Sequence, residues 1–361
     1  MDQGFFRDRT GIQPAALDLW PPVVITKEQI DAEVERLAAL PQPANGRRRA
    51  VIVHPRNKLS EGLAPGIQVT IDVLLPGERT VPYRQNSTQV NFTIRGSGVS
   101  VIGGKRFEMK LHDVCNTPSM HPYWHQNTGD EIFVRLTYSN AALLEMMNVH
   151  YVEENPPAVE AVKHEELSPE DQKRRKSPLG TFQLNDDGAW LMPYEILINP
   201  PSVESKALHW PWAEVKSHLD KLEALGKEYV GRRLYLLYNP LTGRTNGTTP
   251  NFFATMTIRP PKIVDRPHRH TSAAINYYFS GSGRSTVNGE VYEWKAGDLM
   301  LSAPGWAVHN HASYDDYVYE LTIQDQPLNL AMESLLWQES LKLPLAVLGV
   351  EEGFGTNRAA G

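Results

Sequence analysis

The chain contains 361 residues with a formal net charge of −6 and a single cysteine, Cys115. This length accommodates about two domains, and the charge provides no basic surface for nucleic acid. The lone cysteine excludes an intramolecular disulfide and a thiolate metal cluster. No apolar run approaches the roughly 20 residues that span a bilayer, and the N-terminus has no hydrophobic signal core. We therefore expect a cytoplasmic protein without a membrane or nucleic-acid partner.

Residues 1–47 are predicted to form an N-terminal arm that contains one helix. Thr26 is suited to cap this helix, because Gln29 follows three residues later and completes a capping box. An apolar stripe at helical spacing follows, formed by Ile30, Val34 and Leu37. Prolines at positions 41 and 43 then end the helix.

Residues 48–150 show short apolar runs separated by glycine, proline and asparagine. This pattern is typical of a β-sandwich or a small β-barrel. The runs that we predict to be strands are Ala50–Val53, Ile67–Leu75, Gln89–Ile94, Val99–Ile102 and Ile132–Tyr138.

Residues 151–232 are predicted to be an exposed, charged linker followed by a second helix. This helix extends from Pro211 to Gly226, because proline favours helix starts and glycine favours helix ends. Its predicted buried stripe consists of Val215, Leu219 and Leu222. A second strand-rich unit occupies residues 233–335, with strands up to about Ile323. An amphipathic helix follows these strands near Leu328–Gln338, and residues 336–361 are predicted to be a C-terminal tail.

Three histidines in the second strand-rich unit form the most informative pattern of the chain. His268 and His270 are separated by one residue, and His309 follows 39 residues later. Residues at i and i+2 of a β-strand point to the same face. Two such imidazoles and one from a later strand can hold one side of a metal ion and leave the other side open. An open side is suited to chemistry on a substrate, because structural sites are closed by four protein ligands.

The second strand-rich unit repeats the first at an offset of 185 residues. Residues 91–98 match residues 276–283 at this offset. The aligned pairs at the histidines are His268 with Tyr83, His270 with Gln85 and, after a one-residue slip, His309 with His125. A fixed offset indicates duplication of a structural unit. We therefore expect two similar units, the first of which has lost two of the three histidines and no longer binds a metal.

The arrangement of these residues resembles the two sequence motifs of the cupin family. The matching features are the histidine pair, Gly281, Gly297-Asp298, Ala303-Pro304-Gly305 and His309. In full cupin motifs a glutamate lies four residues after the second histidine, and here Ala274 takes that place. The resemblance implies a mainly β fold, a bicupin of two double-stranded β-helix (jelly-roll) barrels with a few flanking helices.

A three-histidine cupin of this kind is similar to the gentisate 1,2-dioxygenases and their relatives, over roughly residues 48–335. The matching segments are 239–243, 267–271, 306–311 and 324–327. The resemblance implies one Fe(II) in the C-terminal barrel, O2 as a substrate, and a hydroxylated aromatic substrate of the gentisate, hydroquinone or salicylate type. It also implies a homo-oligomer, commonly a tetramer, and in some relatives a second subunit.

Two features depart from this family pattern. Well-known gentisate dioxygenases hold iron in the N-terminal barrel. The large subunits of two-component hydroquinone dioxygenases use the C-terminal barrel, but with an acidic ligand that Ala274 does not supply. The family also has an arginine six residues after the second histidine, where it pairs with the substrate carboxylate, and this chain has Asn276 there. Asparagine forms no bidentate ion pair with a carboxylate, so a less acidic aromatic substrate is favoured.

A three-histidine site leaves about three octahedral positions for substrate oxygens and dioxygen. His311 is the predicted base, because it lies two residues beyond a ligand on the same strand face. Asn276 is predicted to contact the substrate and take part in catalysis. Gln324 and Asp325 are predicted to orient a ligand or the substrate. The residues predicted to line an aromatic slot for the substrate are Tyr277, Trp306 and Tyr317.

Structural interpretations stand beside these roles. Asn276 recurs as Asn91 in the first copy, where a structural hydrogen bond suffices, and His311 and Trp306 are also suited to structural positions. At the level of function, two alternatives remain. One is a non-oxidative cupin metalloenzyme, such as an isomerase, lyase or decarboxylase, and the other is an accessory ligand-binding subunit.

Overall fold

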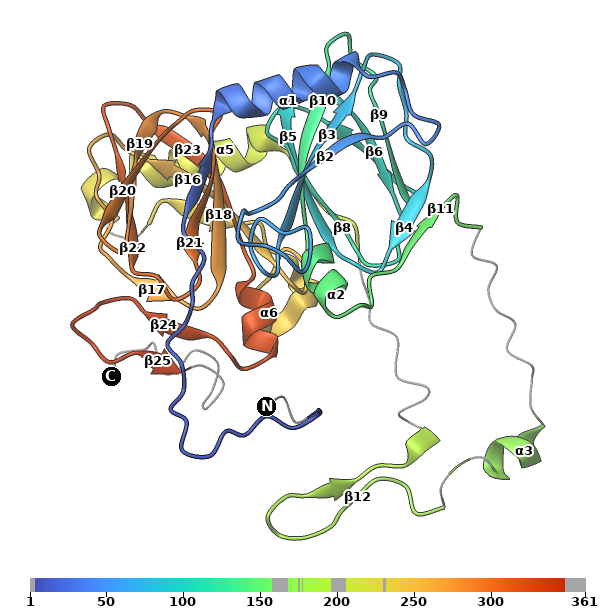
Figure 1. The fold of residues 1–361 in the computed structure, drawn as a ribbon. Coiled ribbons are helices and arrows are strands. Elements are labelled where there is room, and N and C mark those ends of the chain that lie inside the picture. The colour runs from blue at the N-terminus through green and yellow to red at the C-terminus, as the bar shows by residue number, and fades with distance from the viewer. Residues whose placement is uncertain are drawn as a thin grey trace. The chain divides into compact units, whose positions relative to one another are not determined.

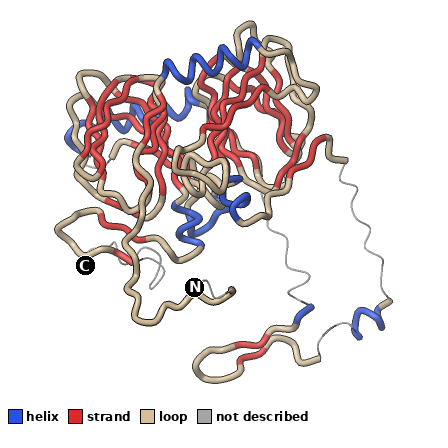
Figure 2. Tube along the Cα trace, in the orientation of Figure 1, coloured by secondary structure: helices blue, strands red, loops and turns tan. Residues whose placement is uncertain are grey.

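The computed structural model describes residues 4–157, 168–174, 176, 178–195, 206–229 and 232–347. The chain divides into two compact units, one made of residues 1–155 and 207–361 and the other of residues 156–206. The larger unit contains two β-barrels that lie side by side (Figure 1). Strands form most of both barrels, and short loops join them (Figure 2). Among the described residues, no helix has the length and apolar character needed to cross a bilayer.

The N-terminal barrel is built from a six-stranded and a five-stranded antiparallel sheet. The six-stranded sheet has the order β14-β8-β5-β10-β3-β2. Its strands are β14 His209–Trp210, β8 Val114–Thr117, β5 Gln89–Arg95, β10 Phe133–Ser139, β3 Gln68–Leu74 and β2 Arg48–Ile52. The other sheet contains β11 Val152–Glu154, β4 Tyr83–Gln85, β9 Tyr123–Gln126, β6 Gly98–Ile102 and β7 Lys105–Met109, in that order. The strands predicted between residues 48 and 150 are present, with ends shifted by up to two residues.

The C-terminal barrel repeats this plan. Its six-stranded sheet has the order β1-β21-β18-β23-β16-β15. Its strands are β1 Val23–Ile25, β21 Leu299–Pro304, β18 Ala273–Ser280, β23 Val318–Gln324, β16 Phe253–Arg259 and β15 Leu234–Leu236. The facing strands are β20 Glu290–Lys295, β19 Ser282–Val287 and β22 His309–Ser313, and a separate small sheet contains β17 Arg269–His270, β24 Leu336–Gln338 and β25 Ala346–Val347.

Two edge strands come from segments outside the barrels they complete. β1 belongs to the predicted N-terminal arm, but it pairs with β21 of the C-terminal barrel. β14 follows the linker region and pairs with β8 of the N-terminal barrel. An added strand satisfies backbone groups that a free sheet edge would leave exposed. These two segments therefore tie the barrels together.

Two helices pack on the barrels, and the predicted apolar stripe is fully buried in the first and partly buried in the second. Helix α1 (Lys27–Ala39) begins after Thr26, whose side chain forms the predicted capping box with Gln29, and its stripe at positions 30, 34 and 37 is buried. Helix α5 (Trp212–Ala224) begins one residue after Pro211. Only Leu219 of its predicted stripe is fully buried, and Val215 and Leu222 are half-buried.

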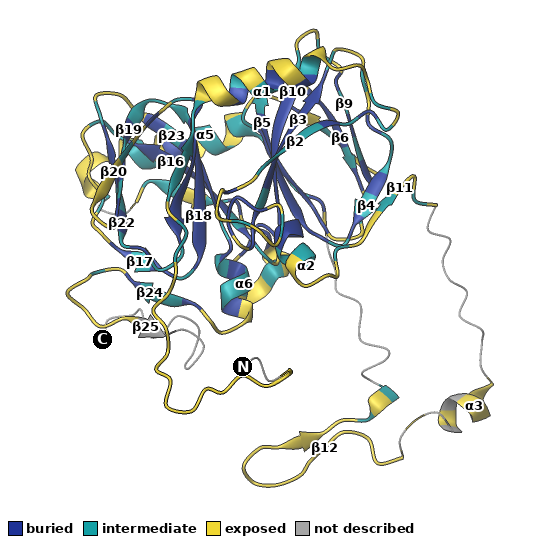
Figure 3. Cartoon of the chain, in the orientation of Figure 1, coloured by how far each residue is buried: buried dark blue, intermediate teal, exposed yellow. Residues whose placement is uncertain are grey.

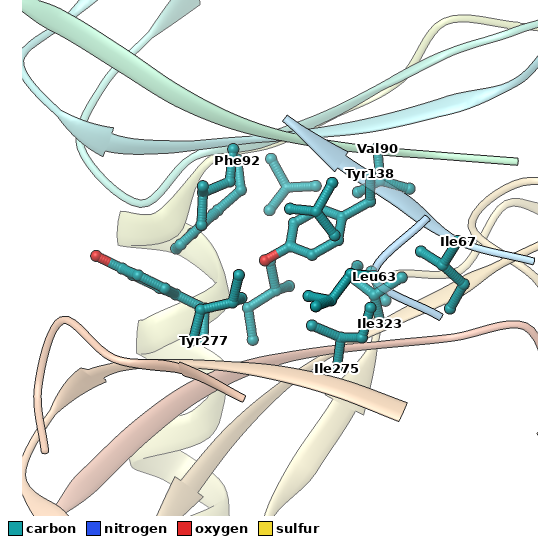
Figure 4. Close-up of a cluster of buried hydrophobic side chains, with 14 of the residues drawn as sticks. Leu63, Ile67, Val90, Phe92, Tyr138, Ile275, Tyr277 and Ile323 are labelled. Atoms are coloured by element: carbon teal, nitrogen blue, oxygen red, sulfur yellow. The ribbon is translucent and has the colours of Figure 1, made fainter. Parts of the chain in front are cut away.

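A continuous hydrophobic core lies between the two six-stranded sheets. Tyr138 and Phe92 from the N-terminal barrel meet Ile275, Tyr277 and Ile323 from the C-terminal barrel (Figure 4). The facing sheets are largely buried, whereas the outer face of α1 is exposed (Figure 3). Since side chains alternate along a strand, the residues between these core positions point into the barrel interiors.

One predicted element is wrong. Instead of one helix near Leu328–Gln338, a short helix α6 (Gln326–Ala331) is followed by strand β24, which pairs with β17. Backbone pairing with β17 overrides the local helical pattern there. Smaller elements are α2 (Ala141–Met146), η1 (Gly226–Glu228) and η2 (Pro240–Thr245).

The predicted linker contains structure of its own. In the smaller unit, α3 (Pro169–Arg174) precedes a hairpin of β12 (Phe182–Gln183) and β13 (Trp190–Leu191). Residues 158–167 and 196–205 of the predicted linker and residues 348–361 of the predicted tail lie outside the described residues.

Candidate metal centre

The structure brings His268, His270 and His309 together at one end of the C-terminal barrel. One ligand atom from each lies within 4.8 Å of the others, and all three residues are buried. The His268–His309 and His270–His309 ring centroids are 4.4 Å and 4.8 Å apart. A pair of backbone hydrogen bonds between His268 and His309, of 3.1 and 2.9 Å, fixes the spacing of the two segments.

Each of these imidazoles is oriented by a backbone carbonyl. The Nδ1 atoms of His268, His270 and His309 lie 3.1, 2.8 and 2.9 Å from the carbonyl oxygens of residues 266, 272 and 307. A carbonyl only accepts hydrogen bonds, so Nδ1 carries the proton and Nε2 keeps a free lone pair. This arrangement is common among metal-binding histidines, because it fixes the tautomer and raises ligand basicity.

Burial keeps the three histidines neutral. It is the main cause that lowers the pKa of His268 to about 4 and that of His309 to about 3, and it holds the pKa of His270 well below the ordinary value. Among the described residues, the group contains no carboxylate or thiolate. Three neutral nitrogen donors fit a divalent transition metal such as iron or zinc.

Gln324 acts on His270 through Ser272. The Ser272 hydroxyl lies 3.2 Å from Gln324 Oε1, to which it donates, and 2.9 Å from His270 Nδ1. A hydroxyl has one proton, so the Ser272 oxygen accepts from His270 Nδ1 when its proton is engaged by Gln324. Gln324 thereby supports the tautomer that leaves Nε2 free.

Asn276 points into the barrel, but its amide is engaged by neighbouring strands. Its Nδ2 donates to Thr322 Oγ1 at 2.8 Å, and its Oδ1 accepts from Ser302. Asn91 occupies the equivalent place in the N-terminal barrel, donates to Thr117 at 3.1 Å and accepts from Thr137. The shared pattern favours a structural role for both asparagines. Ala274, at the usual glutamate position, is buried and provides no ligand.

His311 lies beside the three histidines. Its ring centroid is 5.8 Å from that of His309, and its Nδ1 lies 2.8 Å from the Ser285 hydroxyl. Ser285 is itself held by the Trp294 indole, which donates to it at 3.0 Å. Burial is the main cause that lowers the pKa of His311 well below its ordinary value. The ring is therefore neutral, and one of its two nitrogens is available to accept a hydrogen bond.

The predicted aromatic slot does not form as expected. Tyr277 lies in the core between the barrels, with its ring 5.7 Å from that of Phe92, because residues 276 and 277 point to opposite faces of β18 (Figure 4). Tyr317 is exposed and its hydroxyl donates to Glu223 of α5 at 3.2 Å. Trp306 is half-buried and stacks under the Arg269 guanidinium at 4.4 Å. None of these three side chains has a ring contact with the histidines.

Asp325 supports the start of β18. Its Oδ1 accepts from the Ala273 backbone at 2.8 Å and from the Asn329 side chain at 3.3 Å. Burial raises the pKa of this carboxyl to about 7. Its surroundings fit a structural carboxyl that holds the strand next to Ser272.

Sequence reasoning missed the aromatic residue that covers the centre. Trp337 of β24 stacks on His270 with ring centroids 5.0 Å apart and planes 25° apart, and it is 6.1 Å from His268. Its Nε1 donates to Glu339 at 3.0 Å, and Glu339 also pairs with Arg232 at 3.3 Å. The sequence predicts residues 336–338 as the end of a helix and the start of the C-terminal tail, and no local signal indicates that they pair with β17.

The register of the N-terminal barrel corrects the predicted alignment of His125. In that barrel Ser100 pairs with His125 and Ile102 with Tyr123. In the C-terminal barrel the equivalent Ser285 pairs with His311 and Val287 with His309. Tyr123 therefore takes the place of His309, and His125 that of His311. The first barrel has lost all three histidines of the group.

Comparisons with known proteins agree with this architecture. Residues 258–343 match the family model described as the AraC-like ligand binding domain. The 5-aminosalicylate 1,2-dioxygenase of Comamonas sp. is 25% identical over 295 residues, which are 80% of this chain and 73% of the relative. The gentisate 1,2-dioxygenase of Haloferax sp. is 26% identical over 336 residues, 86% of this chain and 83% of the relative.

A solved structure shares the two-barrel fold. The salicylate 1,2-dioxygenase from Pseudaminobacter salicylatoxidans superimposes with a TM-score of 0.72 at 17% identity, over 92% of this chain and 91% of that protein. The paired jelly-roll barrels, the histidine group and these relatives together show a bicupin that is similar to the gentisate 1,2-dioxygenases.

Proposed function

We propose that this chain is an Fe(II)-dependent ring-cleaving dioxygenase that inserts O2 into a hydroxylated aromatic acid. The observation that carries the proposal is the group of three buried, neutral histidines with their Nε2 atoms free. The relatives named above are dioxygenases of 5-aminosalicylate and gentisate. Fe(II) at this group supplies the redox chemistry between an electron-rich ring and dioxygen.

The chain's own residues bind and orient the substrate. Because the three donors add no negative charge, they favour an anionic phenolic oxygen on the open side of the group. His311, held by Ser285, is suited to accept the proton of a ring hydroxyl. Trp337 presents an aromatic surface next to His270, on which a planar substrate stacks.

Arg232 supports a carboxylated substrate. Its charge is the largest cause after burial for the lowered pKa of His268. It also lowers the pKa of His270, His309 and His311. Its ion pair with Glu339 is exposed, with side chains 44% and 62% accessible. An exposed pair contributes at most about 1 kcal/mol, so a substrate carboxylate can replace Glu339. This reverses the preference for a less acidic substrate that Asn276 suggested.

The test is oxygen consumption by anaerobically purified, Fe(II)-loaded protein. The panel contains gentisate, salicylate, 5-aminosalicylate and hydroquinone. We expect consumption with at least one carboxylated member, lost in His268→Ala and retained in His218→Ala, which changes an exposed histidine of α5. Metal content is measured on each variant, so that loss of metal is separated from loss of turnover.

The same experiment separates the alternatives. Stoichiometric metal without oxygen consumption on any compound would exclude the dioxygenase and favour a non-oxidative metalloenzyme. Protein that retains no metal after loading would favour an accessory ligand-binding subunit.

A further inference from the structure

The interior of the N-terminal barrel contains buried polar side chains beside a hydrophobic cluster that includes Tyr83, Tyr123 and Phe133, and the proposed reaction does not use them. The residues at the positions of the three C-terminal histidines are Tyr83, Gln85 and Tyr123, as the offset and the strand register show. Among the described residues no group of metal-ligating side chains lies in this barrel. What the two barrels share is the serine–histidine pair, with Ser100 Oγ 2.8 Å from His125 Nδ1.

Several buried polar atoms in this interior have no hydrogen-bond partner among the described residues. They are Gln89 Oε1, Thr93 Oγ1, His125 Nε2, and Nε and Nη1 of Arg135. All four residues are at least 95% buried. Each unpaired buried group of this kind costs about 1–3 kcal/mol, and native proteins rarely leave several together.

Because side chains alternate between the two faces of a strand, these atoms point into the interior of the N-terminal barrel. Val134 and Leu136 flank Arg135 and lie in the core between the barrels, so Arg135 points the opposite way. Thr93 is the direct cross-strand partner of Arg135. Gln89 is two positions from Asn91 on the same strand face, and its Nε2 donates to the Tyr123 hydroxyl at 3.0 Å.

The charge balance of this space is positive. Asp72 is the cross-strand neighbour of Arg135, but its carboxylate accepts from Arg49 at 2.6 Å and from Thr70 at 2.8 Å. Burial and then the charges of Arg135, Arg49 and Arg47 lower the pKa of His125. An anion in this interior would pair with donors that are otherwise unsatisfied.

We propose that the N-terminal barrel is a second binding site, for a small hydroxycarboxylate held by Arg135, His125 and Gln89. Arg135 only donates hydrogen bonds, so its free Nε and Nη1 require acceptors, and a carboxylate accepts most strongly from a guanidinium. Gln89 Oε1 only accepts, so it requires a donor, which a ligand hydroxyl provides. His125 Nε2 pairs with either group, according to its tautomer.

An open pocket at the surface includes Glu154, the ion-pair partner of Arg47. A cavity of about 310 Å³ is lined by residues that include Asn45, Val81 and Glu154. Arg47 lies 3.7 Å from Glu154, and its guanidinium stacks 3.4 Å over the ring of Tyr83, which faces the interior. Arg47 therefore lies between Glu154 at this pocket and Tyr83 of the barrel interior.

The test compares matched acids with and without the hydroxyl. Glycolate and salicylate are titrated against acetate and benzoate, by calorimetry and thermal denaturation at constant ionic strength. The protein is the full chain with His268→Ala and His270→Ala, which disable the metal centre of the other barrel. We expect saturable binding of glycolate or salicylate, tighter than that of its hydroxyl-free partner.

Two variants assign the site. In the same background Arg135→Met is expected to weaken binding at least about tenfold, because a charge-assisted hydrogen bond is lost. Should Arg135→Met not fold, Gln89→Leu is expected to remove the preference for the hydroxyl while carboxylate binding remains. The proposal is overturned by the absence of saturable binding with both hydroxy acids, or by equal affinity in these variants. Because the metal centre is disabled throughout, either result is independent of the proposed dioxygenase activity.

Discussion

Replacement of Ser272 by alanine tests how the metal centre is oriented. Ser272 is fully buried, and its hydroxyl links Gln324 to His270 Nδ1. Loss of such a supporting hydrogen bond typically lowers metal affinity 10- to 100-fold. The Ser272 carbonyl still accepts from Nδ1 at 2.8 Å in the variant. We therefore expect the lower end of the range, about tenfold or roughly 1.4 kcal/mol.

Metal affinity is measured anaerobically by competition with a coloured chelator, with Fe(II) and with oxidation-resistant Co(II). Ser285→Ala is the matched control, because it removes the same group from His311, which is not one of the three ligands. We expect Ser285→Ala to retain the metal affinity within about twofold and to lower turnover. If instead Ser272→Ala binds metal like the unmodified protein while Ser285→Ala binds it tenfold more weakly, the orientation we assign to Ser272 is wrong.

Three further predictions follow from the geometry. Arg232→Gln should lower kcat/KM for a carboxylated substrate about 5- to 30-fold, mainly by raising KM, and the loss should be smaller than for a buried ion pair. Glu339→Gln should lower KM, because it frees Arg232 to bind the substrate. A similar loss of kcat/KM with hydroquinone in Arg232→Gln would contradict carboxylate recognition. Tyr277→Ala should destabilise the fold by about 3 kcal/mol in urea denaturation and leave KM unchanged, and a KM effect without destabilisation would restore Tyr277 as a substrate contact. Burial raises the pKa of Asp325 to about 7, so the fold is more stable at low pH, where this carboxyl is neutral in both the folded and the unfolded chain. The free energy of unfolding should fall by up to roughly 4 kcal/mol as the pH rises from about 4 to 7. Asp325→Asn should remove this pH dependence, and an unchanged pH dependence in the variant would show that Asp325 is not its source.

Local patterns determined those elements whose signals lie within a few residues. Helix α1 begins at the capping box of Thr26 and buries the stripe that its spacing indicates. The strands between residues 48 and 150 follow from apolar runs and turn residues. The three histidines converge because two share a strand face and the third begins β22.

The sequence alone does not determine to which face of a sheet a strand residue points, because this depends on the register of strand pairing. Asn276 and Tyr277 are neighbours in sequence, so they cannot share a face of β18, and the packing of the two six-stranded sheets decides that Tyr277 enters the core. A shift of one residue in the pairing register turns every side chain of a strand to the opposite face of the sheet. For the same reason the sequence alignment of His125 with His309 was wrong, and strand pairing shows that it corresponds to His311.

The sequence by itself determined that the chain is a duplicated β-barrel protein with a three-histidine group in its second half, because these features depend on local periodicity and on a constant offset. Only the tertiary structure decided what surrounds that group. β24 brings Trp337 onto His270, and an ion pair brings Arg232 next to Glu339, although more than 60 residues separate the partners in each pair. Contacts between such distant segments arise from long-range strand pairing and packing, which leave no periodic signal in the chain.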